Sequence, residues 1–580
     1  MSLNFKINFS TRHYEPIFLA IVLAVAMLVI KYPEVAEWNL GDNDNFMRLH
    51  QVMTFIESPS WYLQPLKDFN PQDGQIIHWS RIPDLPILAL YYVSRIFVDH
   101  TTALQISIAV VPPIYLIAFI GILCQISQSI FGVKHHILTV LYTFFSIAAV
   151  KFYPGNIDHH NLQILLYSCF ILFTFSPNFT HKAYVYGSAI SISISLLIGL
   201  EVLPFFIITL ALLTIYALYN DPIKLKFIRD LSLLIFLFGV VGIMIFQPVS
   251  IWFNPQYDIL TLPLLCFFLA AAISLSLTLI KPKLTILLIT SIACISLTWF
   301  CFPNVLKSAY SEYPEPLVTY WLSHVSEARP LTTVIKDSSG LSQTWLYLVT
   351  IIPAAMSIFL LSDRKQRIYY VLFIISLLPA ILWQIRTIIF SSIMAIPLNV
   401  TVGLYLFNII KTSGIRIILP LLLAPVLSSI VVIQIEILLN VELKVNSEEK
   451  NVETLSNQDF IKQLGIENKK IFAPMDSGAE IVTLTDNYII TAPYHRNIRG
   501  NLLYVNTLLS DNEQLAFEKL KIEGVDLFLF NKNDNQNKYI INDAKPKSII
   551  RSITEGTPPK WLIPLSDDGH GLTIYELKGQ

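Results

Sequence analysis

The stretch YPGNIDHHN, residues 153–161, is a short polar island between two apolar runs that are each long enough to cross a membrane. Within this stretch Asp158, His159 and His160 are adjacent. A carboxylate beside two imidazoles is energetically costly next to a bilayer unless the groups bind something. The spacing of Asp158 and His160 suits a divalent metal with oxygen and nitrogen ligands. The stretch therefore predicts metal-assisted chemistry at a membrane surface.

The composition places most of the chain in lipid. Of its 580 residues, 54% are hydrophobic and 14% are charged, whereas soluble proteins carry about 25% charged residues. The net charge of −1 gives no basis for nucleic-acid binding. The five cysteines fall in or beside apolar runs without a CxxC pair, so we interpret them as small core residues.

The apolar runs predict a polytopic α-helical membrane protein with about thirteen transmembrane helices. The expected helix cores are 16–31, 104–127, 136–151, 161–176, 184–200, 203–218, 230–247, 260–280, 284–302, 345–361, 368–383, 390–408 and 417–440. Residues 445–580 are polar and alternate strand-like pieces, at 481–484 and 525–530, with the helix-like segment DNEQLAFEKLKI, which predicts an α/β domain. We therefore expect a multi-span domain over 1–440 and a soluble domain over 441–580.

Lysines and arginines gather in alternate short loops, which places those loops in the cytoplasm. The opposite, extracytoplasmic side then receives loop 32–103, the YPGNIDHHN turn, loop 303–344 and the C-terminal domain. We expect a multi-pass protein of the plasma membrane, the inner membrane of the cell, with its active site and C-terminal domain outside. The two long outer loops are the expected catalytic loops.

The first outer loop contains two polar clusters. In GDNDNFMRL, Asp42 and Asp44 lie two residues apart and precede Arg48. Such a pair can hold a hard divalent cation, or it can cap a helix. Further along, His78 can ligate a metal and Trp79 can stack on a sugar, although an interfacial aromatic belt is the alternative.

Two more clusters lie near later spans. Glu327, in WLSHVSEARPLTT, is a candidate base or metal ligand on a mobile loop, or one half of an exposed ion pair with Arg329. Arg386 lies among apolar residues at the outer end of a span. It must face a cavity, an anion or the lipid headgroups, so phosphate binding and headgroup contact both stay open.

Together these motifs resemble those of the catalytic subunits of oligosaccharyltransferases, membrane glycosyltransferases of the GT-C fold. The resemblance covers most of the chain, from the thirteen spans to the extracytoplasmic C-terminal domain. The first acidic motif is similar to the segment from Asp42 to Arg48, and the second to Asp158-x-His160, in the archaeal DHH form. HVSEARPLTT is similar to the SVSE-type motif, with Glu327 as its glutamate. IRTIIFSSIMAIP is similar to the RFTIYA-type segment, whose arginine, here Arg386, contacts the donor pyrophosphate.

The resemblance implies metal-dependent transfer of a sugar or oligosaccharide to a protein or glycolipid acceptor. Since nucleotide sugars are cytoplasmic, an outer site requires a polyprenyl phosphate or pyrophosphate donor, with membrane lipids as neighbours. The implied catalytic residues are Asp42, Asp158 and Glu327. The implied ligands of a Mg²⁺ or Mn²⁺ ion are Asp42, Asp44, Asp158, His160 and His78, and the implied donor phosphate contacts are Arg386 and Arg48.

The C-terminal domain departs from this family. The family's WWDYG-type motif, which contacts the acceptor, has its counterpart in PMDSG, residues 474–478, where only the aspartate and the final glycine are kept. The possible acceptor contacts are therefore Trp79, His159, Asp476, Tyr494 and His495. Two alternatives follow: a GT-C enzyme that acts on a lipid or polysaccharide acceptor, or a transporter of polyprenyl-linked glycans. Because the ionisable residues gather at one membrane face, an enzyme is favoured over a transporter.

Overall fold

The computed structural model of the chain describes residues 14–63, 65–70, 74–175, 182–254, 258–307, 313–338, 341–438 and 456–579. The chain forms two compact units, which we describe separately. The helical unit comprises Met1–Glu37, Ile82–Lys307 and Pro330–Val445, and the sheet unit comprises Trp38–Arg81, Ser308–Arg329 and Asn446–Gln580.

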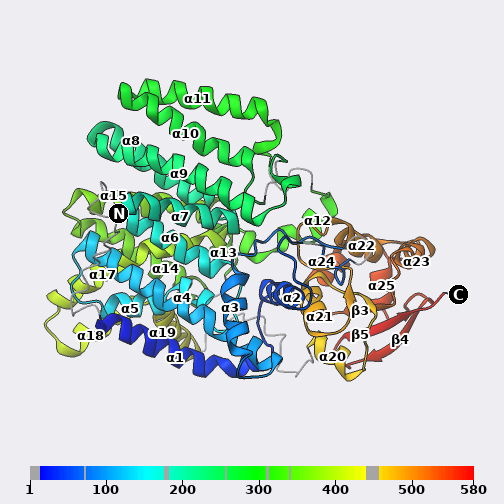
Figure 1. Cartoon of the computed structure of the whole chain (residues 1–580). Coiled ribbons are helices and arrows are strands. Elements are labelled where there is room, and N and C mark those ends of the chain that lie inside the picture. The colour runs from blue at the N-terminus through cyan, green and yellow to red at the C-terminus, as the bar shows by residue number, and fades with distance from the viewer. Residues whose placement is uncertain are drawn as a thin grey trace. The chain divides into compact units, whose positions relative to one another are not determined.

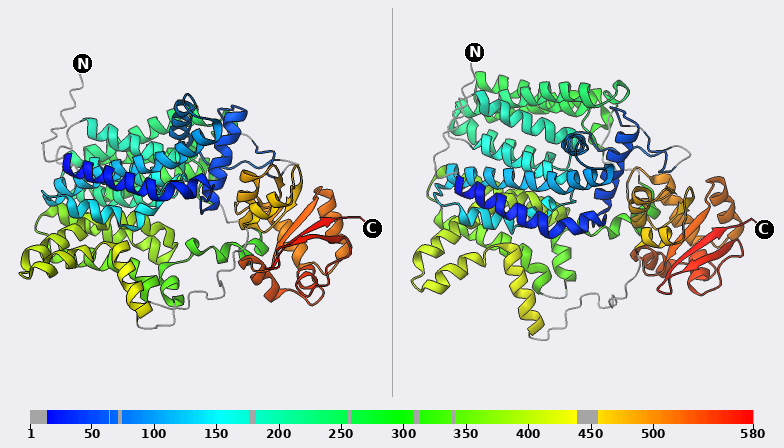
Figure 2. Two further views of the ribbon diagram at one scale, coloured as in Figure 1. Left: turned by 90° about the horizontal axis from the view of Figure 1, so that it is seen from below. Right: turned by 60° about the horizontal axis from the view of Figure 1, so that its bottom comes forward.

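The helical unit consists of apolar helices joined by short connections (Figure 1). These helices are α1 (Tyr14–Ala36), α3 (Asp84–Ser94), α4 (His100–Phe131), α5 (Ile137–Phe144), α6 (His160–Thr174), α7 (Lys182–Ile198), α8 (Leu203–Asn220), α9 (Pro222–Phe246), α10 (Leu262–Ile280), α11 (Leu284–Cys301), α13 (Leu331–Asp337), α14 (Leu341–Met356), α15 (Arg364–Ser376), α16 (Leu378–Leu382), α17 (Ile388–Ile409), α18 (Ser413–Leu421) and α19 (Pro425–Leu438). Helices α6, α7, α9, α10 and α11 pack in series, one against the next (Figures 1 and 2).

Within the described residues, eight helices are long and apolar enough to cross a membrane, or nine if α18 and α19, bent by 104°, form one span. Every one of the thirteen expected cores contains a helix, but several helices are shorter than expected. Core 136–151 is divided into α5 and the 3₁₀ helix η2 (Ile147–Phe152), because the Ser146 side chain accepts a bond from the Ala149 amide and starts a new turn.

Polar residues set where these helices start. The Asp99 carboxylate accepts a hydrogen bond from Thr102 at the start of α4, and Asp221 caps α9 just before Pro222. Gly132, with φ of 68°, ends α4 in the left-handed conformation that glycine adopts easily. Short polar signals between apolar runs therefore define the helical unit.

The sheet unit contains a five-stranded mixed sheet in the order β2-β1-β3-β5-β4. Strand β1 runs parallel to β2 and β3, whereas β5 runs antiparallel to β3 and β4. The strands are β1 (Lys470–Phe472), β2 (Tyr488–Ile489), β3 (Leu527–Asn531), β4 (Leu562–Asp567) and β5 (Leu572–Leu577), and the helices are α2 (Asn43–Glu57), α12 (Glu315–Tyr320), α20 (Asn457–Gln463), α21 (Met475–Leu484), α22 (Ile498–Leu509), α23 (Glu513–Ile522), α24 (Asn535–Asp543) and α25 (Ile549–Thr554).

Both long outer loops contribute to the sheet unit. In the first loop, Phe69 forms a parallel bridge with Ile489 beside strand β2. In the second loop, Leu317 of α12 is fully buried in the core formed by the C-terminal segment. The expected boundary at 440–441 lies in 439–455, outside the described residues. The compact unit is thus assembled from three separate chain segments.

Candidate functional site

The DHH turn of the helical unit is attached to α4 by a proline. Pro112 has no amide hydrogen, so the Ile108 carbonyl cannot make its usual helical hydrogen bond. The amide of Gly155 donates to this carbonyl at 3.1 Å. Gly155 has φ of 85°, a conformation that is costly for other residues. The PG pair of the YPGNIDHHN stretch therefore fixes the turn directly on a neighbouring helix.

Four ionisable side chains cluster at this turn. The Asp158 carboxylate contacts His159 through Oδ1 and Nδ1 at 2.5 Å, and His160 through Oδ2 and Nε2 at 3.4 Å. The other ring nitrogen of His159, Nε2, lies 3.5 Å from Oε1 of Glu201. Asp158 and His159 are buried, with 5% and 3% exposure. His159 is thus held between two carboxylates, which favours a supporting role over the expected acceptor contact.

The charges in this cluster stabilise one another. Burial disfavours the charged forms, but the carboxylates of Asp158 and Glu201 outweigh it and raise the pKa of His159 to about 10. Burial likewise opposes ionisation of Asp158, but the positively charged His159 holds its pKa well below the usual range, with help from Lys151. His159 similarly outweighs burial and lowers the pKa of Glu201. The turn therefore carries charged groups next to apolar helices.

Arg386 lies in the 3₁₀ turn η8 (Ile385–Thr387), directly before α17. One turn later, Phe390 contacts Tyr167 of α6 and Phe205 of α8, with ring centroids 5.6 and 4.9 Å apart. The start of α17 thus packs against the helices that carry the DHH turn and Glu201. The Arg386 Nε donates to Gln384 Oε1 at 2.8 Å, and its side chain stays partly exposed.

In the sheet unit, Asp42 caps helix α2. Its side chain accepts a hydrogen bond from the Asp44 amide at 3.0 Å, so the capping alternative is present in the structure. The C-terminal segment holds the same turn: the Tyr494 hydroxyl donates to the Asn43 carbonyl, and the Thr483 hydroxyl donates to the Phe46 carbonyl, both at 3.0 Å. Asp42 and Asp44 remain partly exposed, so their carboxylates stay accessible to a ligand.

Arg48, one turn further along α2, is fully buried. Its guanidinium lies over the Trp79 ring at 4.9 Å and donates to the Ser80 carbonyl at 3.0 Å. Trp79 has 4% exposure and packs edge-on against Tyr494. This burial favours a structural role for Arg48 and Trp79 over the expected donor and acceptor contacts.

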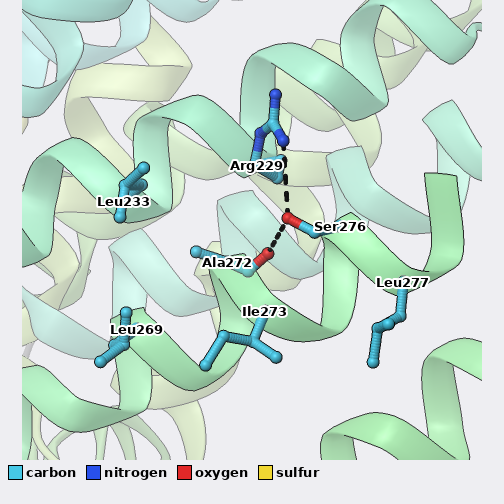
Figure 3. A pocket seen from close by; sticks show the side chains of 7 residues that line it. All are labelled: Arg229, Leu233, Leu269, Ala272, Ile273, Ser276 and Leu277. Carbon is cyan, nitrogen blue, oxygen red and sulfur yellow. Dashed lines mark hydrogen bonds between the residues drawn. The ribbon is translucent and has the colours of Figure 1, made fainter.

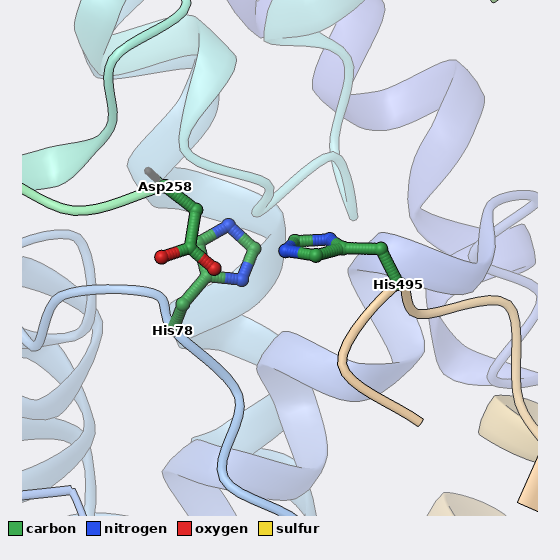
Figure 4. Close-up of side chains that lie close together, drawn as sticks. All are labelled: His78, Asp258 and His495. Carbon is green, nitrogen blue, oxygen red and sulfur yellow. The ribbon is translucent and has the colours of Figure 1, made fainter. Parts of the chain in front are cut away.

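Two histidines from distant parts of the sheet unit face each other. The rings of His78 and His495 have centroids 4.8 Å apart and are inclined by 61° (Figure 4). Both rings are only partly buried. Two predictions made separately, His78 as a metal ligand and His495 as an acceptor contact, therefore concern one pair of side chains.

Glu327 lies in the 3₁₀ turn η6 (Ser326–Ala328) and is exposed. Nearby, His324 stacks on Tyr539 of α24 with ring centroids 3.5 Å apart. Together with the buried Leu317, this stack attaches the described part of the loop, 313–329, to the C-terminal segment. The chain around Glu327 is thus anchored at several points.

The PMDSG stretch begins helix α21. Asp476 lies in the first turn of this helix, where a carboxylate is favourable. Gly478 packs directly on the backbone carbonyl of Thr491, so a larger side chain would collide there. The chain shares this aspartate and this glycine with the WWDYG-type motif. The start of helix α21 accounts for the aspartate, and close packing against Thr491 accounts for the glycine.

Comparison with known proteins adds to this geometry. No family model matches the chain, and no curated protein matches it. Solved structures of the Archaeoglobus fulgidus oligosaccharyltransferase do: one tethered with an acceptor peptide containing the NVT sequon (13% identity, TM-score 0.63), and one, named AglB, in complex with an inhibitory peptide and a dolichol-phosphate (14%, 0.63). Each match covers 98% of this chain and 74% of the other. The chain has the fold of an archaeal oligosaccharyltransferase. At these identities the similarity concerns the fold.

The helical unit also has a cavity between α9 and α10. That cavity, of about 230 Å³, is lined by Arg229, Leu233, Leu269, Ala272, Ile273, Ser276 and Leu277 (Figure 3). The Arg229 guanidinium pairs with the Asp230 carboxylate at 2.6 Å and lies 3.5 Å from the Ser276 hydroxyl. Apart from Arg229 and Ser276 the lining is aliphatic, so it offers no carboxylate, imidazole or thiol for acid–base or metal chemistry.

The DHH turn fits a divalent cation. Ligand atoms bind such an ion at about 2.0–2.2 Å, so neighbouring ligands lie roughly 3 Å apart. The 3.4 Å between Asp158 Oδ2 and His160 Nε2 is close to this separation. A carboxylate oxygen and an imidazole nitrogen also suit Mn²⁺, and the carboxylate suits Mg²⁺.

Sequence analysis overlooked Glu201, Gln163 and Lys151. Glu201 is a single carboxylate in GLEVLPF, between the expected cores 184–200 and 203–218. The argument applied to the DHH stretch, that a charged group beside a bilayer is costly without a partner, applies equally to Glu201. This signal could have identified it.

Proposed function

We propose that this protein transfers a sugar or oligosaccharide from a polyprenyl phosphate or pyrophosphate to an acceptor at the outer membrane face, with a divalent cation. The observation that carries the proposal is the cluster of Asp158, His159, His160 and Glu201, of which Asp158 and His159 are buried, within an oligosaccharyltransferase-like fold. Ionisable clusters beside membrane helices are costly and are typical of sites of binding or chemistry. The AglB structure with bound dolichol-phosphate supports a polyprenyl-linked donor.

In this reaction the bond between the anomeric carbon and the donor phosphate oxygen breaks, and its electron pair leaves with the phosphate. The anomeric carbon bonds to the acceptor atom, which loses a proton. A cation held by Asp158 and His160 would supply positive charge that offsets the charge on the leaving phosphate.

Arg386 donates charge-assisted hydrogen bonds to the same phosphate, with Gln384 holding its Nε. Contributions of Asp42, Asp44 and His78 to the ion, and of Glu327 to the acceptor, stay predictions.

A second candidate is transfer to a lipid or polysaccharide acceptor. The observation that favours it is PMDSG, which lacks both tryptophans of the family motif and whose Gly478 is needed for packing against Thr491. A peptide acceptor is supported by the A. fulgidus structure tethered with an acceptor peptide. The two candidates share the donor half of the reaction and differ only in the acceptor.

The test is release of polyprenyl phosphate or pyrophosphate by the purified full chain in lipid nanodiscs. The assay contains Mn²⁺, a polyprenyl-linked glycan and either an Asn-Val-Thr peptide or a glycolipid. We expect release with one acceptor, and a loss of at least about 100-fold in Asp158→Ala and Arg386→Ala. Glu436→Gln, which alters a buried carboxylate in α19, is the control and should retain activity. Wild-type rates in both site variants would overturn the proposal.

A further inference from the structure

We infer that Glu201, acting through Gln163, is a positioning residue that fixes the tautomer of His160 and leaves its Nε2 unprotonated toward a divalent cation. The inference rests on the proposed function, because it concerns the ion assigned to Asp158 and His160. Neither residue lies in the DHH turn: Gln163 is in the first turn of α6, and Glu201 lies between α7 and α8.

The contacts of Gln163 determine which way its amide faces. Its Nε2 lies 3.0 Å from Glu201 Oε2 and 3.2 Å from the Gly199 carbonyl. A carboxylate and a carbonyl oxygen only accept hydrogen bonds, so the end of the amide that faces both must be the NH₂ group. The amide oxygen then points the other way, and it lies 3.4 Å from His160 Nδ1.

This orientation selects one form of the His160 ring. Because the amide oxygen can only accept, Nδ1 must carry the proton, and in neutral imidazole Nε2 is then left with its lone pair. This Nε2 is the atom 3.4 Å from Asp158 Oδ2. Metal-binding histidines usually donate their second N–H to an acceptor in this way, which fixes ring and tautomer. Without Glu201, the Gln163 amide loses one of the two acceptors that hold it and can turn over.

Glu201 uses its two oxygens on two different residues. Oε2 accepts from Gln163, while Oε1 faces Nε2 of His159 at 3.5 Å. Gly199 leaves the space for this arrangement, because a Cβ at Gly199 would collide with the Glu201 carboxylate. One carboxylate thus supports both histidines of the turn.

The test measures Mn²⁺ binding by electron paramagnetic resonance on the full chain in nanodiscs. We expect Glu201→Leu and Gln163→Leu each to weaken Mn²⁺ binding about 10- to 100-fold. Since the two residues act in series, the double variant should be no weaker than the single ones. Glu201→Gln keeps an acceptor oxygen for Gln163 and should recover most of the affinity. Glu436→Leu removes a carboxylate that accepts from the Ser342 amide in the same unit, and should bind Mn²⁺ like the wild type.

A spectroscopic readout separates positioning from general damage. Nitrogen NMR of ¹⁵N-histidine-labelled protein should show His160 protonated on Nδ1 in the wild type and a shift toward Nε2 protonation in Gln163→Leu. Unchanged Mn²⁺ affinity in both single variants, with binding lost in Asp158→Ala, would overturn the inference and leave the proposed function intact. If Glu201→Leu does not fold, Gln163→Leu decides the outcome. Donor cleavage at the wild-type rate in both Asp158→Ala and Arg386→Ala would instead overturn the proposed function.

Discussion

The two acidic turns of this chain, at Asp158 and at Asp42, are held in place by different kinds of contact. At Asp158 the partners are charged, and they include the next two residues together with Glu201. At Asp42 the turn is held by hydrogen bonds from uncharged donors, and the hydroxyl of Tyr494 comes from 451 residues away. One motif is supported by local charge and the other by distant packing.

This difference has an energetic consequence. Buried charges depend on one another, so removing one partner leaves the others uncompensated. A neutral hydrogen bond contributes about 1 kcal/mol, so its removal weakens a turn without collapsing it. We therefore expect removal of one partner to destabilise the whole DHH turn, and removal of one hydrogen bond to destabilise the Asp42 turn only slightly.

The largest expected effect comes from His159→Phe. This change leaves the carboxylates of Asp158 and Glu201 buried without their common partner, which should lower the free energy of unfolding by about 3–5 kcal/mol. The measurement is thermal unfolding of the purified protein in nanodiscs. The same substitution at the exposed His100, bonded to the Tyr91 hydroxyl, should cost about 1 kcal/mol or less. Equal losses at the two positions would show that the charges around His159 do not make the DHH turn more sensitive than an exposed contact.

A pH-dependent effect of intermediate size is expected at Glu480, in the helix α21 that also carries Thr483. Burial, together with the neighbouring Asp459 carboxylate, raises the pKa of Glu480 to about 7 from 4.5, although Lys462 opposes this. The folded state therefore holds the proton more tightly, and its stability falls as pH rises from about 4.5 to about 7. Glu480→Gln removes the penalty and should add about 1–2 kcal/mol at pH 8 and almost nothing at pH 4.

The readout is the melting temperature of the full chain as a function of pH. The exposed Glu518, changed to Gln, serves as the control and should shift stability by less than about 0.5 kcal/mol. A gain from Glu480→Gln that is equal at pH 4 and pH 8 would show that titration of this carboxyl is not the cause.

Tyr494→Phe probes the Asp42 turn directly. The loss of the bond to the Asn43 carbonyl should cost about 1 kcal/mol. If Asp42 takes part in the reaction, donor cleavage should fall about 3- to 10-fold while the protein stays folded. Tyr539→Phe, which keeps the stack on His324, is the matched control and should leave cleavage unchanged. Equal rates in both variants would show either that the Tyr494 bond does not support the turn or that Asp42 takes no part in the reaction.

The smallest effect is expected at His324. His324→Ala removes the stack on Tyr539, a contact that contributes about 0.5–1.5 kcal/mol. The segment around Glu327 should then open more often, and limited proteolysis should cut it several-fold faster. His570→Ala, a control in the sheet unit, should leave the rate of proteolysis of this segment unchanged. If the loop is cut equally fast in His324→Ala and the wild type, the stack does not anchor it.

Much of the fold could be predicted from the sequence, because apolar runs and the polar residues between them report directly on membrane helices. The helix at each expected core and strand β3 within 525–531 follow from such local signals, whereas the expected strand at 481–484 is wrong, because those residues form the end of helix α21. The division of core 136–151 into α5 and η2 is harder to predict from sequence. The apolar run favours one long helix, but the Ser146 side chain caps a new turn and ends α5. The length of a helix is thus predicted less well than its presence.

The site was partly predictable for the same reason. Asp158 and His160 are neighbours in sequence, so their proximity in space needs no tertiary information. The burial of Arg48 beneath Trp79 depends on how a loop folds back over α2, and no local pattern reports that. The contact of Tyr494 with Asn43 is still less visible, because it joins residues near opposite ends of the chain.

The sheet unit is built from three separated segments of the chain, which limits when it can fold during synthesis. The chain passes from one unit to the other at 37–38, 81–82, 307–308, 329–330 and 445–446. Chains are made from the N-terminus at about 5–20 residues per second, and domains tend to fold as they appear. Phe69 and Leu317 emerge long before the strands that cover them, so their apolar surfaces must wait for the last 135 residues. The sheet unit can complete its core only after the segment that starts at residue 446 has been made, and a fragment that begins at residue 441 would never complete it.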